Sequence, residues 1–166
     1  MKTVGIVGVG LIGGSFGLAL RAAGFTGEIL GVSSRPAVAA GLACGAISSG
    51  VTLGEAAARA DLLYLAQPVD RILETLGSLA GIVRPECLVT DAGSTKQQIV
   101  QRARGLSFLG GHPLAGKERR GVEAAEPMLF RDPAYVLTPA AAPTPTTQAF
   151  QGWLGKFGAR VIEMSP

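Results

Sequence analysis

A glycine-rich turn near the start of the chain constrains its fold more than any other feature. Gly8, Gly10 and Gly13 form the pattern GxGxxG. The pattern follows residues 3–9, a run rich in β-branched side chains that is typical of a strand, and opens residues 11–23, where apolar residues recur at helical spacing. A strand, a glycine turn and a helix in this order predict a βαβ unit whose helix N-terminus faces the phosphates of a dinucleotide.

Each residue of this turn has a distinct expected role. Gly8 allows the tight turn, Gly10 lets a pyrophosphate approach the backbone, and Gly13 allows the helix to pack closely on the strand. Leu11 and Ile12 lie between the glycines, in the first turn of the helix, where their backbone amides add donors to the cradle. The alternative is a glycine turn that holds no ligand.

The same alternation of strand and helix continues along the chain. Strands are predicted over residues 28–33, 61–66, 87–91, 106–110, 135–138 and 160–163, and helices over residues 36–43, 69–79, 96–104 and 146–157. Such alternation indicates parallel strands joined by crossover helices. We therefore expect an α/β fold with a Rossmann-type, doubly wound, mostly parallel sheet and helices on both faces. A length of 166 residues fits one domain, spanning residues 1–166.

The composition limits the class of partner. Fifteen Lys and Arg against twelve Asp and Glu leave a net charge of +3 without a basic stripe, so a small anionic ligand is expected rather than a nucleic acid. Cys44 and Cys87 are far apart and lack CxxC spacing, so we expect no disulfide and no metal site, and interpret both as small core residues. No apolar run reaches the ~18 residues of a membrane span, which favours a cytoplasmic protein without membrane contact.

The end of the second predicted strand bears on the choice of coenzyme. Enzymes that use NAD usually carry an acidic residue there, about twenty residues after the glycine turn. This chain has Ser33, Ser34 and Arg35 instead. Two hydroxyls and a guanidinium suit a 2′-phosphate, because arginine offers a planar fork of donors and a carboxylate would repel the anion. We therefore predict NADP over NAD; in the alternative, a serine caps the next helix and Arg35 faces water.

Three further segments follow strands at the edge where open α/β sheets bind ligands. They are Gln67-Pro68, the stretch DAGSTK at residues 91–96, and the stretch GGHPLAGKE at residues 110–118. The last contains His112, the only histidine in the chain. A histidine on a loop between two glycines and a proline is better placed for chemistry than for a core, although it could also be satisfied within a turn. Topology is expected to bring Ser94 and His112 to one crevice.

Four motifs in order resemble the prephenate/arogenate dehydrogenase family of tyrosine biosynthesis. They are GVGLIGGS at residues 8–15, DAGSTK at 91–96, GGHPLAGKERRG at 110–121 and MSP at 164–166. The resemblance covers essentially the whole chain but only the nucleotide-binding part of such an enzyme. The family also has a C-terminal helical domain, absent from this sequence, that forms a homodimer and adds substrate contacts.

The resemblance implies a reaction and roles for individual residues. The reaction is the NADP-dependent oxidative decarboxylation of arogenate to tyrosine, or of prephenate to 4-hydroxyphenylpyruvate. His112 would accept the proton of the ring hydroxyl while hydride leaves the same carbon. Ser94 would bind that hydroxyl or orient His112, and Gln67 and Pro68 would lie beside the nicotinamide.

The resemblance also places Gly116, Lys117 and Glu118 at the entrance of the site. Glu118 could equally be a surface carboxylate paired with Arg119 or Lys117, and Lys117 could bind an anionic substrate or face water. Because the helical domain is absent, the apolar end at residues 161–162 is a candidate exposed patch or interface. Two other functions stay open: a non-catalytic NADP-binding module, and another Rossmann-type 3-hydroxyacid dehydrogenase.

Overall fold

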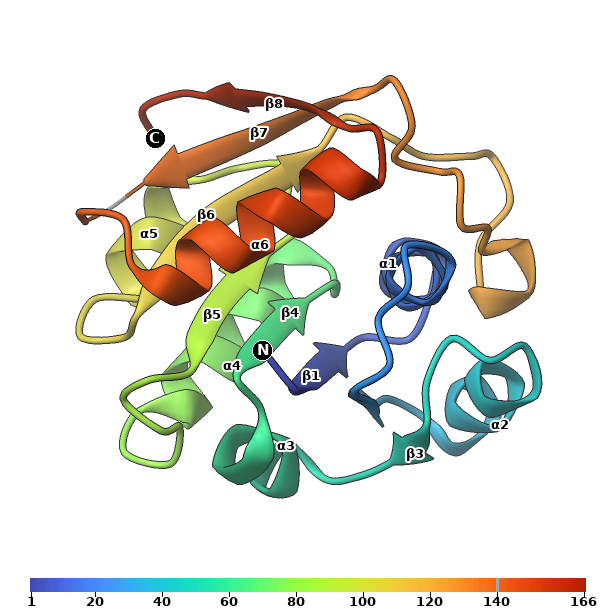
Figure 1. The fold of residues 1–166 in the computed structure, drawn as a ribbon. Helices are drawn as coiled ribbons and strands as arrows, with labels where there is room; N and C mark the ends of the chain where they lie inside the picture. The colour runs from blue at the N-terminus through green and yellow to red at the C-terminus, as the bar shows by residue number, and fades with distance from the viewer. Residues whose placement is uncertain (140) are drawn as a thin grey trace.

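The computed structural model describes residues 1–139 and 141–166 and forms an eight-stranded sheet with helices on both faces (Figure 1). The strands are β1 (Thr3–Val7), β2 (Glu28–Val32), β3 (Ser49–Gly50), β4 (Leu62–Leu65), β5 (Leu88–Asp91), β6 (Phe108–Pro113), β7 (Ala134–Pro139) and β8 (Arg160–Glu163). Their order across the sheet is β3-β2-β1-β4-β5-β6-β7-β8. The pairs from β3 to β6 are parallel, β7 runs antiparallel to β6, and β8 pairs in parallel with β7. The predicted mostly parallel, Rossmann-type sheet is confirmed.

The helices divide between the two faces of the sheet. They are α1 (Leu11–Ala22), α2 (Arg35–Ala43), α3 (Leu53–Arg59), α4 (Val69–Leu79), α5 (Gln97–Arg102) and α6 (Pro145–Lys156), with a short 3-10 turn, η1 (Val122–Ala124). All four residues of β4 are buried, and they alternate between the faces. Leu62 and Tyr64 belong to the core under α1 and α6, whereas Leu63 and Leu65 belong to the core under α3, α4 and α5.

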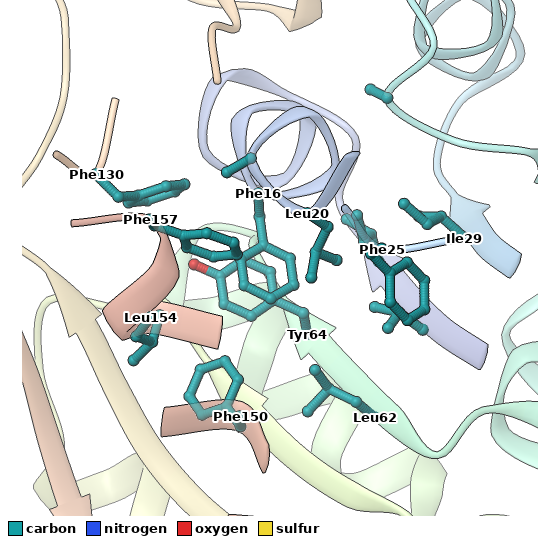
Figure 2. Packing of buried hydrophobic residues seen from close by; sticks show 14 of the residues in the cluster. Phe16, Leu20, Phe25, Ile29, Leu62, Tyr64, Phe130, Phe150, Leu154 and Phe157 are labelled. Carbon is teal, nitrogen blue, oxygen red and sulfur yellow. The ribbon is translucent and has the colours of Figure 1, made fainter. Parts of the chain in front are cut away.

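An aromatic cluster fills the first of these cores (Figure 2). Phe16 of α1 stacks on Tyr64 of β4, with ring centroids 4.0 Å apart and planes 9° from parallel. Phe157, which follows α6, meets Phe16 edge to face at 5.6 Å. The Tyr135 hydroxyl donates to the Tyr64 hydroxyl at 3.1 Å, so each of the two buried phenols has a hydrogen-bond partner. These contacts fix α1, which follows the glycine turn, to β4 in the middle of the sheet and to the end of α6.

The order of the strands locates a binding crevice. From β1 the chain passes outward to β2 and β3, and then returns to place β4 on the other side of β1. The loops after β1 and β4 therefore diverge at the carboxyl end of the sheet. Such a switch point is where open α/β sheets bind ligands.

Several predictions of individual elements were wrong. His112 is inside β6, paired opposite Val136 of β7, because the strand runs to Pro113 rather than ending at residue 110. The sequence also did not predict β3 or α3, which are too short for a clear period. The α3 helix is set by a capping box, in which Thr52 Oγ1 accepts from the Glu55 amide at 3.3 Å and Glu55 Oε2 accepts from the Thr52 amide at 2.7 Å.

The two cysteines differ in environment. Cys87 is buried, and burial raises the pKa of its thiol to about 11, as expected for a core residue. Cys44 is exposed at the end of α2, so its interpretation as a core residue was wrong. In the part of the chain that the structure describes, no helix has both the length and the apolar character needed to cross a membrane.

Candidate active site

The glycine turn holds three glycines for three different reasons. Gly8 has a φ of 97°, and a Cβ there would lie 2.5 Å from the Ala66 carbonyl oxygen. A Cβ on Gly13 would lie 2.1 Å from the Gly8 carbonyl oxygen. A Cβ on Gly10 would meet no protein atom within 4 Å. The fold therefore explains Gly8 and Gly13, whereas Gly10 leaves open space in front of the helix, as a phosphate group approaching the backbone requires.

The N-terminus of α1 is open to an anion. Gly10 occupies the N-cap and offers no side-chain hydrogen bond, and the first turn contains no acidic residue. Leu11 and Ile12 are partly buried and pack against the first core, and their backbone amides lie in the first turn of the helix. Uncapped amides at a helix N-terminus carry partial positive charge and bind phosphates. These residues fit the pyrophosphate of a dinucleotide.

A groove of about 780 Å³ opens in front of this turn. Most of the residues predicted to bind the coenzyme line this groove, and they come from the loops after β1, β2 and β4. Its lining consists of Gly8, Val9, Gly10, Val32, Ser33, Ser34, Ala37, Ala66, Gln67, Pro68, Arg71 and Gly121. Arg71 and Gly121 were not predicted from the sequence. Arg71 lies four positions after Gln67, in the first turn of α4. The signal for it in the sequence is this position, because the first turn of a helix that follows a ligand-binding loop can form a wall of the same groove.

Of the three residues after β2 that were predicted to bind the coenzyme, only the two serines line this groove. Ser33 and Ser34 line it, whereas Arg35 is exposed and lines an adjoining hollow together with Ser33, Val38 and Glu55. Ser34 occupies the N-cap of α2 but makes no side-chain capping hydrogen bond. The structure thus brings the two hydroxyls to the groove and leaves the predicted guanidinium beside it.

Gln67 is held in place on the opposite wall. The Thr75 hydroxyl of α4, itself 7% exposed, donates to Gln67 Oε1 at 2.8 Å. This hydrogen bond orients the amide before any ligand arrives, and Pro68 follows as the exposed N-cap of α4.

A buried ion pair organises the other end of the crevice. The fully buried carboxylate of Asp91, the last residue of β5, forms a salt bridge with the Lys96 ammonium. Asp91 Oδ2 also accepts from the Gly93 amide at 2.8 Å, and Asp91 Oδ1 accepts from the Gly111 amide at 3.1 Å. One side chain thereby fixes the DAGSTK loop to β6. Burial raises the pKa of the Asp91 carboxyl, against the effect of Lys96 and the two amides, and burial lowers the pKa of Lys96.

His112 lies beside this pair and is partly buried. Burial lowers its pKa, the positive charge of Lys96 lowers it further, and the carboxylate of Asp91 acts in the opposite direction. The imidazole is therefore neutral near pH 7, with a nitrogen available to accept a proton. Lys96 was not singled out from the sequence, because only the fold places it next to His112.

Ser94 is exposed on the loop after β5, at the same end of the sheet as His112. Among the described residues, no hydrogen bond joins Ser94 to His112. The structure thus places both at the carboxyl ends of the neighbouring strands β5 and β6 without linking them.

The segment after β6 returns across α1 (Figure 1). Lys117 Nζ pairs with Glu126 Oε2 at 2.6 Å, rather than with Glu118. The Glu126 amide donates to the buried Ser15 hydroxyl of α1 at 3.0 Å. This return brings Gly121 to the groove, while Gly116 and Glu118 remain exposed.

The last strand is exposed along its length. Val161 is 37% exposed and Ile162 is 36% exposed, and Met164 just beyond them is also exposed. The apolar exposed end expected from the sequence is present.

Residues 16–163 match the family model described as prephenate dehydrogenase, nucleotide-binding domain. Prephenate dehydrogenase of Lactococcus lactis subsp. cremoris is 41% identical over 145 residues, which are 83% of this chain and 41% of that protein. The solved structure of Aquifex aeolicus prephenate dehydrogenase in complex with hydroxyphenyl propionate and NAD+ has a TM-score of 0.91 and 33% identity, covering 100% of this chain and 60% of that one. Synechocystis arogenate dehydrogenase has a TM-score of 0.87 and 30% identity, covering 99% and 60%.

The chain therefore spans less than half the length of the Lactococcus relative and three-fifths of the two solved chains. The matched region contains the DAGSTK and GGHPLAGKERRG motifs and the strands from β2 to β8, whereas β1 and the glycine turn precede it. The Aquifex comparison covers the whole chain, including β1 and the glycine turn, with the same fold. The chain belongs to the prephenate dehydrogenase family and corresponds to its nucleotide-binding domain.

Proposed function

We propose that this chain is the coenzyme-binding part of a dehydrogenase that oxidatively decarboxylates arogenate or prephenate. The observation that carries the proposal is the position of His112, partly buried beside the Asp91–Lys96 pair and at the same sheet edge as the dinucleotide groove, where burial lowers its pKa. The likeness to enzymes that act on prephenate and arogenate supports the substrate class. A module that only binds the coenzyme would have no use for a neutral base held at this edge.

His112 has two proton transfers to perform in this reaction. It accepts the proton of the ring hydroxyl while that carbon loses hydride and becomes a carbonyl. The coenzyme, when bound, supplies the acceptor for the hydride. The carboxylate on the opposite ring carbon then leaves as CO2, and the electrons of the broken C–C bond pass through the ring to the carbonyl oxygen. His112 returns its proton to that oxygen, so the product is a phenol and the imidazole is neutral again.

Neighbouring residues prepare His112 for these transfers. Burial and, after it, the charge of Lys96 lower the pKa of the imidazole and so disfavour its protonation before the reaction, and the Lys96 ammonium also favours negative charge on the ring oxygen. Asp91 holds Lys96 and the backbone of β6 in one arrangement. Ser94 is proposed to bind the ring hydroxyl or to orient His112, and Gly116, Lys117 and Glu118 to border the entrance.

The coenzyme is proposed to be NADP. A nicotinamide dinucleotide is supported by the groove and by the likeness to the Aquifex structure that contains NAD+. Preference for a 2′-phosphate is supported by Ser33 and Ser34 in the groove, since none of the residues that line it is acidic. Arg35 is close enough to the groove, through the shared Ser33, to contribute a charge at its edge.

Reduction of the nicotinamide, followed by absorbance, tests the proposal. NADP+ and NAD+ are each offered with arogenate and with prephenate, to the 166-residue chain and to the full product of its gene. Reduction with either substrate supports the enzyme and names its substrate and coenzyme. Coenzyme binding without reduction by the full product would favour the binding-module alternative, and tighter binding of NADH than NADPH would contradict the NADP assignment. The full product is also proposed to form a homodimer, as the family resemblance implies, and to bind no nucleic acid; sedimentation of that product measures its oligomeric state.

A further inference from the structure

We propose that Arg71 binds the coenzyme by covering the face of its adenine ring, and so sets the affinity for NAD and NADP alike. This inference rests on the proposed use of an adenine dinucleotide. It concerns a residue that the motifs do not contain and that only the folded groove brings into view.

The groove places Arg71 on the wall opposite the residues after β2. Because β1 lies between β2 and β4, the glycine turn forms the floor, with the residues after β2 on one side and those after β4 on the other. Ser33 and Ser34 stand on the first wall and Arg71 on the second. A pyrophosphate at Gly10 has the β2 side for its adenosine half and the β5–β6 side, with His112, for its reactive half. The adenine then lies between the serines and Arg71.

The surfaces around Arg71 suit a flat aromatic ring. Val32 and Ala37, on the β2 side, contribute apolar side chains to the same groove. Arg71 is the one cationic residue among those that line it. A guanidinium is planar and weakly hydrated, so it stacks well on aromatic faces.

The charges next to Arg71 argue against a 2′-phosphate as its partner. Arg71 Nη1 pairs with Glu74 Oε2 at 2.7 Å along α4, and Asp70 precedes it. Two carboxylates so close would repel a phosphate dianion, whereas they leave the face of the guanidinium open to a base. The pair with Glu74 is weak because both side chains are more than half exposed, 64% and 63%, so it restrains Arg71 without withholding it from a ligand.

A series of substitutions at one position tests stacking against charge. Dissociation constants for NADPH and NADH are measured by fluorescence titration for wild type, Arg71→Ala, Arg71→Lys and Arg71→Phe. Arg71→Ala is expected to weaken both ligands by about 5- to 20-fold, the range of a partly desolvated cation–π contact. Arg71→Phe is expected to stay within about 3-fold of wild type, since a ring also stacks on adenine, and Arg71→Lys to lie between the two.

Arg104→Ala is the matched control, because Arg104 is exposed but lies in a different hollow, at the opposite end of the sheet. It is expected to leave both dissociation constants unchanged. The inference is overturned if Arg71→Ala has no effect, or if it weakens NADPH alone and Arg71→Phe behaves like Arg71→Ala, which would indicate a phosphate contact. Failure of the proposed function is distinguishable, because it would show as an absence of dinucleotide binding in the wild type.

Discussion

The carboxylate of Asp91 and the backbone amide of Gly111 are joined by a 3.1 Å hydrogen bond between the ends of β5 and β6. The contact requires a glycine, since a Cβ on Gly111 would lie 2.5 Å from the Asp91 carbonyl oxygen. Gly111 directly precedes His112. The hydrogen bond that joins the end of β5 to β6 therefore also fixes the backbone that carries the proposed base. Asp91 acts on His112 through this backbone and through Lys96, and its own charge opposes the lowering of the His112 pKa.

Asp91→Asn is expected to destabilise the protein strongly. The substitution keeps the shape but leaves the Lys96 ammonium buried without its counter-charge, and breaking a buried pair costs about 3–5 kcal/mol. Urea unfolding of the 166-residue chain measures the free energy of unfolding. The double variant Asp91→Asn, Lys96→Met removes the orphaned charge and should recover part of the loss. Equal stability of wild type and Asp91→Asn would show that the pair is not charged in the folded state.

His112→Asn is expected to lower turnover by roughly two to four decades, the scale of a lost general base. The affinity for the coenzyme should change little, because His112 is not among the residues that line the dinucleotide groove. Steady-state rates of the full gene product and coenzyme titration give the two quantities separately. Unchanged turnover would remove His112 from the mechanism, whereas a parallel loss of coenzyme affinity would indicate a structural role.

The lowered pKa of His112 predicts how stability depends on pH. The unfolded imidazole binds a proton near its ordinary pKa of about 6.5, while the folded imidazole resists protonation until lower pH. The contribution of the neutral His112 to stability is therefore fully present above the unfolded pKa of about 6.5. It is lost as the pH falls through 6.5 toward the lower pKa of the folded protein. Urea unfolding of wild type and His112→Gln between pH 7.5 and pH 5 should show a steeper decline for wild type. A steeper decline for the variant would mean that the pKa of His112 is raised.

The extent to which the sequence predicted the site depends on how local each feature is. Gly8, Gly10 and Gly13 act within one turn, and the strand and helix periods beside them are local as well, so the cradle and the sheet class could be predicted. Lys96 next to His112, and Arg71 opposite Ser33, depend on which loops the sheet order brings together. No pattern along the chain contains that information.

The extent of β6 shows a second limit. Alternation predicted a strand that ends at residue 110, because two glycines and a proline usually mark a loop. The strand continues because β7 pairs antiparallel with residues Leu109 to Pro113, and Gly110 and Gly111 make room for close neighbours on either side. A tertiary pairing thus decided the conformation that local propensity would have assigned to a loop.

The attachment of the segment after β6 to α1 should contribute to stability more through Ser15 than through Lys117. Ser15→Ala removes a fully buried acceptor and leaves the Glu126 amide unpaired, which is expected to cost about 1–3 kcal/mol. Lys117→Ala breaks a pair whose side chains are 37% and 43% exposed, so the cost should be at most about 1 kcal/mol. Urea unfolding of both variants measures the difference. A larger loss in Lys117→Ala would mean that the ion pair, not the buried hydroxyl, anchors this segment to α1.

Gly10→Ala and Gly13→Ala separate binding from folding within one motif. A Cβ on Gly10 meets no protein atom within 4 Å and the residue has a φ of −114°, so the free energy of unfolding should stay within about 0.5 kcal/mol of wild type. The same Cβ would occupy the space proposed for the pyrophosphate, so dinucleotide affinity should fall at least about tenfold. Gly13→Ala forces a Cβ to within 2.1 Å of the Gly8 carbonyl oxygen, so stability itself should fall by about 1–3 kcal/mol. Urea unfolding and NADPH titration are measured on both variants. If Gly10→Ala bound NADPH as tightly as wild type, the open space above Gly10 would not be where the phosphates lie.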